Sequence, residues 1–174
     1  MKITNKIYTG IGSRETPSDI LSVMKDLAKK LGVMGWTLRS GCAQGADSAF
    51  ETGAKGFPTE LYLPWNGFEG RSSVEVTLTQ PNPDTFPIAE QFHPSWSYLS
   101  QGARKLHSRN VHQVLGKDIQ NPVLSDMVIC WTKNGSGKGG TGQALRMAEH
   151  YNIPIYDMGN VIVLTELKKK FEIE

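Results

Sequence analysis

The sequence predicts an α/β fold in which a parallel sheet is covered by helices on both faces. Two features of the 174 residues lead to this prediction. Short apolar segments of strand length alternate with longer segments of helical periodicity, a pattern that produces right-handed crossovers between parallel strands. In addition, glycine-rich turns follow three of the short segments, beginning at Gly12, Gly41 and Ser136. Turns of this kind connect strands to helices in such folds.

The first half of the chain contains three segments of strand length, residues 7–11, 36–40 and 60–64. Between the first two, apolar residues recur every three or four positions, which predicts a helix that Gly32 and Gly35 end. We expect Ser18 or Asp19 to cap the N-terminus of this helix. An alanine-rich segment after the second strand predicts a short helix with small packing side chains.

Residues 65–101 interrupt the alternation and are predicted to form an irregular insertion. The prolines within residues 81–87 favour loop, while residues 74–78 are a candidate short strand. A stretch of this length inside a compact domain is typical of functional or mobile segments. Helical periodicity returns most clearly from residue 103 to 115, in a basic segment with no acidic residue before Asp118.

The second half contains a buried strand at 127–131, a helix at 144–150 and a further strand at 153–157. Residues 161–164 are expected to add a strand and residues 165–171 a terminal helix. These elements predict a single Rossmann-like domain over residues 1–174, with the strand order 3-2-1-4-5. In that order the first and fourth strands are neighbours, and ligands bind where the order reverses, beyond the carboxyl ends of the strands.

Composition narrows the function classes. The net charge is +2, from 19 basic and 17 acidic residues, so the strongly basic footprint of a dedicated nucleic-acid binder is absent. Cys42 and Cys130 lie far apart without metal-ligand spacing, and we expect reduced thiols, no metal and no cofactor. The first residues lack the apolar core of a signal peptide, and no apolar run approaches the roughly 20 residues of a membrane helix. These features predict a cytoplasmic protein without membrane association.

The turn at Ser136–Gln143 is a candidate phosphate-binding loop. Backbone N–H groups and the dipole of the following helix favour an anion there, and glycine lets a ligand approach the backbone closely. A tight, flexible connection without a ligand is the alternative. The residues expected to hold a phosphate are Lys138, Gly139, Gly140, Thr141 and Gly142.

Two earlier turns are expected to share the same sheet edge. In the first turn, the Ser13 hydroxyl and the planar guanidinium of Arg14 suit a phosphate. In the second, Asp47 can accept a hydrogen bond from a ribose hydroxyl or anchor the loop, and anchoring is favoured because phosphates repel a carboxylate. The expected binding residues of these turns are Gly12, Ser13, Arg14, Ser40, Gly41, Cys42, Ala43, Gly45 and Asp47, with Pro64 and Trp65 as a cover.

Three ordered motifs resemble the superfamily, known as SLOG, that joins DprA-type DNA-processing proteins to the Lonely Guy phosphoribohydrolases. Gly12-Ser13-Arg14-Glu15-Thr16-Pro17 is similar to the first-turn signature of DprA-type domains, and Ser40-Gly41-Cys42-Ala43-Gln44-Gly45-Ala46-Asp47 to their second-turn motif. Leu124–Val128 leading to Gly139-Gly140-Thr141-Gly142 fits both branches. The resemblance covers residues 7–64 and 103–158.

The Lonely Guy branch implies cleavage of the base–ribose bond of nucleotides. Leu106-His107-Ser108-Arg109-Asn110 resembles its histidine-x-arginine-lysine segment, so Arg109 matches an active-site arginine, whereas Asn110 replaces the lysine. Leu145 and Arg146 stand where that branch carries glutamates, and Glu149 lies one helical turn farther on. Because general acid–base help is worth about 10²–10⁴ in rate, the missing carboxylate weighs against an enzyme.

Two other branches remain. The DprA branch implies binding of single-stranded DNA, for which aromatic residues of the insertion offer stacking surfaces. A sensor branch implies binding of nucleotide-derived signals without catalytic carboxylates, and the sequence fits it best. The resulting prediction is a homo-oligomeric protein that binds a nucleotide or nucleotide-derived small molecule, with Arg109 and Lys138 neutralising phosphates. N-glycosidase activity and single-stranded nucleic-acid binding are the alternatives.

Overall fold

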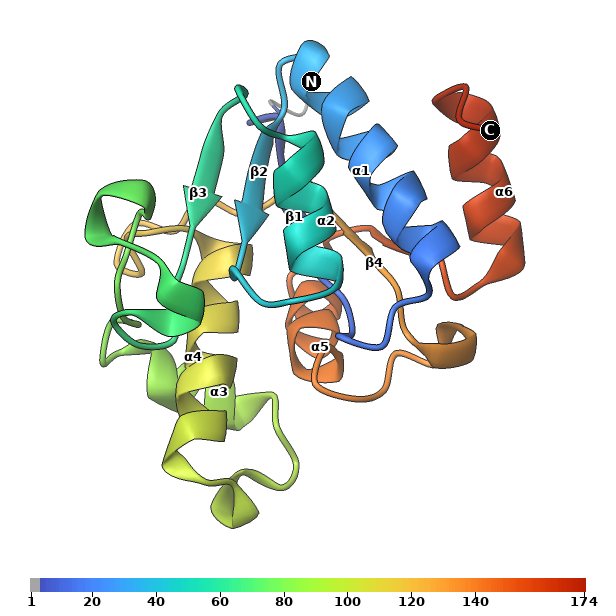
Figure 1. The fold of residues 1–174 in the computed structure, drawn as a ribbon. Helices are drawn as coiled ribbons and strands as arrows, with labels where there is room; N and C mark the ends of the chain where they lie inside the picture. The colour runs from blue at the N-terminus through green and yellow to red at the C-terminus, as the bar shows by residue number, and fades with distance from the viewer. Residues whose placement is uncertain (1–3) are drawn as a thin grey trace.

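The computed structural model describes residues 4–174, whose strands form one parallel sheet (Figure 1). The strands are β1 Ile7–Gly10, β2 Thr37–Ser40, β3 Thr59–Leu61, β4 Met127–Cys130 and β5 Ile155–Asp157. Their order is β3-β2-β1-β4-β5, and every neighbouring pair is parallel. The predicted fold class and the predicted order 3-2-1-4-5 are confirmed. The order reverses between β1 and β4, where Tyr8 lies opposite Met127.

Helices cover both faces of the sheet (Figure 1). They are α1 Ser18–Val33, α2 Ala46–Gly53, α3 Thr85–Gln91, α4 Gln101–Leu115, α5 Gly142–His150 and α6 Val161–Lys170. One apolar core joins α1, α2 and α6 to the sheet through Ile129, and the other joins α4 and α5 through Val128 and Cys130. This division follows from the strand, where successive side chains point to opposite faces.

Two local predictions about helix starts were wrong. Residues 161–164 begin helix α6 instead of a strand, because Val163, Leu164 and Leu167 form one apolar stripe at helical spacing. The Asn160 side chain accepts a hydrogen bond from the Ile162 N–H at 2.9 Å and so starts the helix. Pro17, not Ser18 or Asp19, is the N-cap of α1, and no side chain caps it.

The insertion at 65–101 also differs from the predicted strand at 74–78. Residues Ser73–Glu75 form a 3₁₀ turn closed by a capping box between Ser72 and Glu75, and only an isolated bridge links Leu78 to Tyr62. The insertion contains α3 and the 3₁₀ turns Phe68–Gly70 and Trp96–Tyr98. It is fastened to the domain at separate points, among them an ion pair between Arg71 and Glu51.

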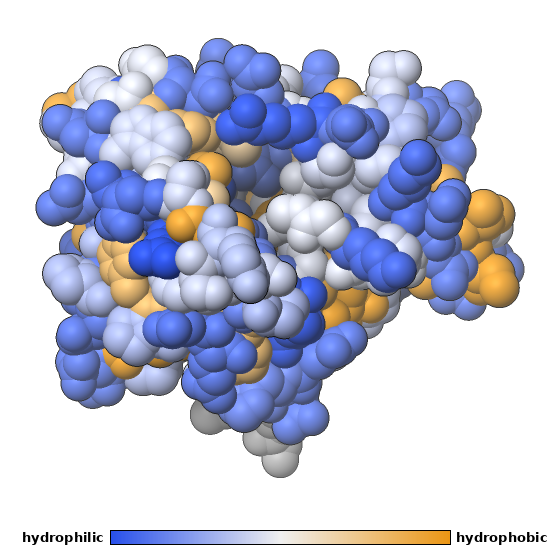
Figure 2. Space-filling model, turned by 90° about the horizontal axis from the view of Figure 1, so that it is seen from below, coloured by the Kyte–Doolittle hydropathy of each residue, from blue (hydrophilic) through white to orange (hydrophobic). Residues whose placement is uncertain are grey.

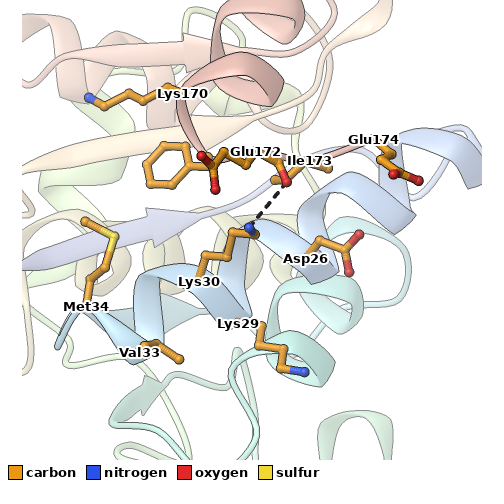
Figure 3. Close-up of a pocket in the computed structure, with 10 residues that line it drawn as sticks. Asp26, Lys29, Lys30, Val33, Met34, Lys170, Glu172, Ile173 and Glu174 are labelled. Atoms are coloured by element: carbon orange, nitrogen blue, oxygen red, sulfur yellow. Dashed lines mark hydrogen bonds between the residues drawn. The ribbon is translucent and has the colours of Figure 1, made fainter.

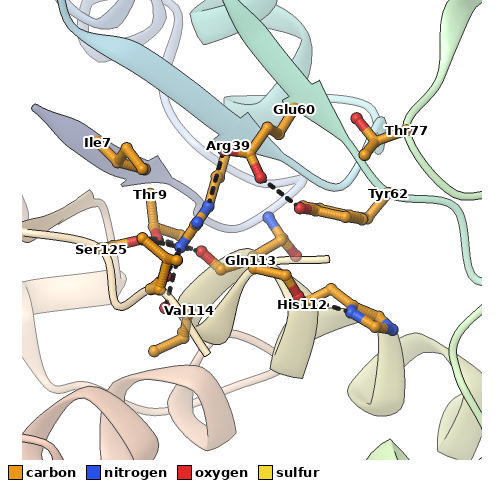
Figure 4. A network of polar contacts seen from close by, with 12 residues as sticks. Ile7, Thr9, Arg39, Glu60, Tyr62, Thr77, His112, Gln113, Val114 and Ser125 are labelled. Carbon is orange, nitrogen blue, oxygen red and sulfur yellow. Dashed lines mark hydrogen bonds and ion pairs between the residues drawn. The ribbon is translucent and has the colours of Figure 1, made fainter. Parts of the chain in front are cut away.

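A polar network fastens the C-terminal end of α4 to the sheet (Figure 4). Arg39 of β2 is 2% exposed, and its Nη1 donates to the carbonyl oxygens of Val114 and Val123 at 3.2 and 2.6 Å. Its Nε lies 3.3 Å from the carboxylate of Glu60, and Thr9 donates to the carbonyl of Gln113. Because the network holds the end of α4, it also sets where the rest of that helix lies over the sheet edge.

Within residues 4–174, no helix has both the length and the apolar character that crossing a membrane requires.

Candidate functional site

The three glycine-rich turns meet at the carboxyl edge of the sheet, as predicted from the parallel order. Figure 2 views the molecule from this side, where the surface is largely hydrophilic and hollowed. The turns and helix α4 line a cavity of about 430 Å³ there, beside the switch point between β1 and β4. Its lining comes from the turns and from α4: Ile11, Gly12, Ser13, Arg14, Glu15, Ala43, Asp47, Ala103, Leu106, His107, Arg109, Asn110, Gly140 and Thr141.

The first two turns fit together through glycines. A Cβ atom at Gly12 would lie 2.7 Å from the Cβ of Ala46, and one at Gly45 would lie 2.8 Å from the Cα of Arg14. Gly45 also has φ +85°, a conformation that other residues rarely adopt. These glycines therefore allow the turn after β1 to lie directly against the N-terminus of α2. Ser13 Oγ accepts from the N–H of Glu15 at 2.9 Å and keeps its own proton available.

The second turn is held by a carboxylate and a guanidinium from different helices. Asp47 Oδ2 accepts from the Ala43 N–H at 3.2 Å, which is the anchoring contact expected from the sequence. Arg109 Nη1 donates to the carbonyl oxygen of Gly41, and a Cβ at Gly41 would lie 2.5 Å from that nitrogen. Glycine is thus required at this position so that the arginine can reach the backbone. Burial raises the pKa of Cys42 to about 12, so its thiol stays protonated and is no nucleophile.

Asp47 uses only one of its two carboxyl oxygens. The residue is 3% exposed, and Oδ1 has no hydrogen-bond partner. Burial raises the pKa of Asp47 to about 6, although the nearby positive charge of Arg109 opposes this increase. A buried acceptor without a partner is costly, because the fold has removed its water without replacing the lost hydrogen bonds.

Arg109 places a positive charge in the cavity wall that forms no ion pair, although the buried Asp47 carboxylate acts on it from beyond 4 Å. It is 6% exposed, donates through Nε to Asn110 Oδ1 at 3.1 Å, and has its Cζ 5.9 Å from the ring centre of Phe68. The ion pairs among residues 4–174 involve Arg39 and Arg71, so no carboxylate lies within 4 Å of this guanidinium. Burial lowers the pKa of Arg109, with Asp47 opposing, but a guanidinium remains charged in proteins.

The neutral polar side chains His107 and Asn110 line the α4 side of the cavity, and Gln143 of α5 contacts Asn110. Asn110 Nδ2 donates to Oε1 of Gln143 at 3.2 Å, while His107 Nδ1 and Gln143 Nε2 have no partner. Burial, together with the neighbouring His93, lowers the pKa of His107 to about 4, so its imidazole is neutral at pH 7. These three residues were not among the predicted binding residues. His107 and Asn110 lie three positions apart, so helical spacing in the sequence predicts that they share one face of α4.

The turn at 136–143 contributes less than the sequence predicted. Gly140 and Thr141 line the cavity, immediately before α5, whereas Lys138 is exposed outside it. The turn is anchored from behind, because Thr132 Oγ1 accepts from the Gly137 N–H at 2.9 Å. It therefore forms one wall of the cavity and does not surround a ligand by itself.

The predicted binding residues divide into two groups. Those that line the cavity are Gly12, Ser13, Arg14, Ala43, Asp47, Arg109, Gly140 and Thr141. Those that do not are Ser40, Gly41, Cys42, Gly45, Pro64, Trp65, Lys138, Gly139 and Gly142. Ser40 donates instead to Glu51 at 3.0 Å, and Trp65 packs edge-on against Phe68 with ring centres 5.0 Å apart. Phe68, rather than Trp65, is the aromatic side chain that contacts Arg109.

The residues at the expected glutamate positions face away from the cavity. Leu145 is buried in the core between α4 and α5, and Arg146 Nε donates to the carbonyl of Phe92 at 2.7 Å. Glu149 is exposed on α5 and is not part of the lining. Asp47 and Glu15 are the carboxylates in the lining. Among residues 4–174, no cluster of three His, Cys, Asp or Glu residues could hold a metal ion.

A larger hollow of about 740 Å³ lies near the opposite edge of the sheet, between the end of α1 and the C-terminal residues (Figure 3). Lysines surround it, and Lys30 Nζ donates to the carbonyl of Glu172 at 3.3 Å. No buried polar atom without a partner belongs to its lining. Two unpartnered buried atoms, Asp47 Oδ1 and His107 Nδ1, belong to residues that line the cavity at the carboxyl edge.

No protein-family model matches the sequence, and a sequence comparison with curated proteins finds no match. Among solved structures, DNA processing protein A from Helicobacter pylori, studied for its single-stranded DNA binding mode, is similar with a TM-score of 0.53 and 16% identity. The similarity covers 87% of this chain but 64% of that chain, so this chain spans less than two thirds of that protein. The molybdenum cofactor carrier protein from Chlamydomonas reinhardtii has a TM-score of 0.39 at 16% identity, over 92% of this chain and 96% of that one. The first similarity shows a shared fold.

Proposed function

We propose that this chain binds a nucleotide or a nucleotide-derived phosphorylated small molecule in the cavity at the carboxyl edge of the sheet. The observation that carries the proposal is Arg109, a buried cation in the cavity wall with no carboxylate within 4 Å. Removing a charge from water costs several kcal/mol unless a partner compensates it. A phosphate in the cavity would supply the missing negative charge.

The surroundings of Arg109 suit a phosphate. Gly140 and Thr141 precede α5, whose N-terminal dipole favours an anion, and the Thr141 hydroxyl can donate to one. Ser13 and Arg14 line the same cavity from the turn after β1. A guanidinium binds phosphate through two parallel hydrogen bonds, which makes arginine more selective for this group than lysine.

The α4 side of the cavity suits the uncharged part of such a ligand. Ala103 and Leu106 supply apolar surface, while neutral His107 and Asn110 supply donors and acceptors. A volume of about 430 Å³ falls within the range of about 300–1,000 Å³ that small-molecule sites occupy. Polar groups that are placed beside apolar surface can fix one orientation of a ligand.

Calorimetry with ADP-ribose, cyclic nucleotides and nucleoside monophosphates tests the proposal, with the matching nucleosides as unphosphorylated controls. We expect R109Q to weaken binding by about 10–100-fold, since a hydrogen bond to a charged group contributes about 1.5–3 kcal/mol. R104Q is the matched control, because Arg104 lies on the same helix but donates to the Trp96 carbonyl outside the cavity. Absence of binding to every phosphorylated nucleoside, or equal losses in both variants, contradicts the proposal.

The same assays separate the two alternatives. Single-stranded DNA binding predicts an affinity that falls steeply with salt, and R104Q would then lose as much affinity as R109Q. N-glycosidase activity predicts release of free base from a nucleoside monophosphate, which chromatography detects. Mass spectrometry of a small molecule that copurifies with the protein would identify a natural ligand directly.

We also propose that the chain acts as one domain with an insertion at 65–101 and that it self-associates, as the resemblance of its motifs implies. Light scattering on the purified protein measures the oligomeric state. A monomer at all accessible concentrations contradicts self-association without affecting the proposed ligand site, since every lining residue belongs to one chain.

A further inference from the structure

Asp47 is a buried carboxylate in the cavity lining whose second oxygen is unused. It is 3% exposed, and Oδ1 has no partner, although Oδ2 accepts from the Ala43 N–H at 3.2 Å. The hydrogen-bonding capacity left over at Oδ1 is that of an acceptor. A ligand with an O–H or N–H donor is the complement of this group.

The hydrogen bond to Ala43 does not by itself require a carboxylate, although the charge of Arg109 and the backbone N–H of Gly41 favour one. An asparagine oxygen could accept the same hydrogen bond from Ala43, and the turn is held independently by Ser48, whose hydroxyl donates to the Ala43 carbonyl at 2.9 Å. Burial raises the pKa of Asp47 to about 6, so a carboxylate at pH 7 destabilises the fold. A destabilising charged group inside a cavity is characteristic of a functional residue.

The backbone of the second turn brings Asp47 and Arg109 into the same part of the cavity wall. Arg109 is bonded to the carbonyl of Gly41, and Asp47 to the N–H of Ala43, two residues farther along. Two residues of chain span at most about 7 Å. The sugar of a nucleoside phosphate can bridge such a distance, with the phosphate toward Arg109 and the ring hydroxyls toward Asp47. The reverse orientation would place a phosphate beside a carboxylate, which repels it.

We propose that Asp47 Oδ1 accepts a hydrogen bond from a ribose hydroxyl, so that the cavity selects ribonucleotides over deoxyribonucleotides. This inference rests on the proposed nucleotide site and narrows its ligand class. In this arrangement Asp47 distinguishes between sugars, and Arg109 contributes affinity by binding the phosphate. It also predicts a sugar preference opposite to that of a site made for DNA.

Calorimetry with AMP, GMP, CMP and UMP, and with the 2′-deoxy and 3′-deoxy form of each, tests the inference on the full chain. We expect at least one ribonucleotide to bind wild-type protein about 10–100-fold more tightly than one of its deoxy forms, as the loss of a hydrogen bond to a charged acceptor requires. The 2′-fluoro analogue, which keeps an atom of similar size but cannot donate, should bind as weakly as the 2′-deoxy form if the 2′ hydroxyl is the one recognised.

D47N is the discriminating variant and E15Q its matched control. The amide of D47N can still accept from Ala43 but is a weaker acceptor toward the ligand, so the ratio of ribo to deoxy affinity should fall below about 3-fold. E15Q removes the same charge from the same cavity, and it should shift both affinities by one common factor, because Glu15 is exposed and has no buried unpaired oxygen. Circular dichroism checks that both variants are folded.

Each outcome decides between the proposals. Equal binding of ribo and deoxy forms by wild type overturns the sugar selectivity while leaving the nucleotide site intact. A ratio that D47N leaves unchanged assigns the selectivity to another residue and overturns the role of Asp47. Absence of any nucleotide binding removes the proposed function itself. Because the wild-type comparison uses only ligand variants, a D47N protein that fails to fold does not prevent the test.

Discussion

Arg39 and Arg109 are both buried arginines that touch α4, yet their surroundings differ. Arg39 is 2% exposed and pairs with Glu60, while its Nη1 donates to the carbonyls of Val114 and Val123 and to Ser125 Oγ (Figure 4). Arg109 is 6% exposed and donates to Gly41 and Asn110, with no carboxylate within 4 Å. Glu60 pairs with the first charge, whereas the second forms no ion pair.

This difference separates a buried arginine that has a counter-ion from one that has none within 4 Å. Both side chains are hydrogen-bonded, so hydrogen bonds alone do not separate them. The separating features are the counter-ion and the cavity: Arg39 has Glu60 and lies in a packed region, whereas Arg109 lines open volume. Substitutions that change one of these two regions at a time test the comparison.

R39Q should cause the largest loss of stability. It leaves Glu60 and the carbonyls of Val114 and Val123 without their donor, and breaking a buried pair costs about 3–5 kcal/mol. Urea unfolding measures the change in free energy. R71Q is the matched control, because Arg71 and Glu51 form a more exposed pair that should contribute about 1 kcal/mol or less. Equal losses of unfolding free energy in the two variants would contradict the expectation that the buried pair contributes more than the exposed pair.

D47N should stabilise the free protein at neutral pH. The folded-state pKa of Asp47, about 6, is above its ordinary value, so wild type loses stability as the pH rises from about 4 through 6. The substitution removes this loss, which amounts to at most about 3 kcal/mol because one pKa unit corresponds to about 1.4 kcal/mol. Unfolding at pH 4 and pH 7.5 should show the gain only at the higher pH. If D47N is less stable than wild type at pH 7.5, the Asp47 carboxylate stabilises the fold and the prediction is wrong.

Lowering the pH should destabilise both regions, because each contains one buried histidine that resists protonation. The pKa of His107, beside the cavity, falls to about 4 through burial, and that of His112, near Arg39, is also lowered by burial. Because the folded state binds fewer protons, stability should fall as the pH drops below about 6.5, by up to about 1.4 kcal/mol per pH unit for each group.

The variants H107Q and H112Q separate these two contributions. His112 Nδ1 lies 2.8 Å from the Gly116 carbonyl, and Nε2 accepts from the Asn82 N–H at 3.0 Å, so its protonation also frees the insertion. H107Q should make the pH dependence of unfolding shallower between pH 6.5 and 4, and H112Q should make it shallower below pH 6.5. A slope unchanged in both variants shows that other groups cause the acid sensitivity.

R109Q should have the smallest effect on stability, about 1 kcal/mol in either direction. It loses hydrogen bonds to Gly41 and Asn110, but it also removes the unfavourable burial of an unpaired charge. Unfolding in the absence of ligand measures this value. A loss as large as that of R39Q would show that Arg109 belongs to the structural framework.

Much of the fold follows from local patterns. Alternation of strand and helix periods placed all five strands within a few residues of their observed bounds and predicted their order correctly. Residues 161–164 were misassigned because Val161-Ile162-Val163 resembles a strand, whereas packing of Val163 and Leu164 against the core selects a helix. Asp47 and Arg109 were expected to bind ligand from their motifs, but His107 and Gln143 were not, since their positions depend on how α4 and α5 face each other.

The sequence by itself determined the five strands, the sheet order and the edge at which the glycine turns meet, because glycine conformation and apolar periodicity act over a few residues. Tertiary structure decided which charges are compensated. Arg39 finds its partners 21 to 86 residues away, and Arg109 reaches Gly41 across 68 residues without meeting a carboxylate. Whether a buried arginine meets a counter-ion is therefore decided only when distant segments pack, since a counter-ion acts through space and not along the chain.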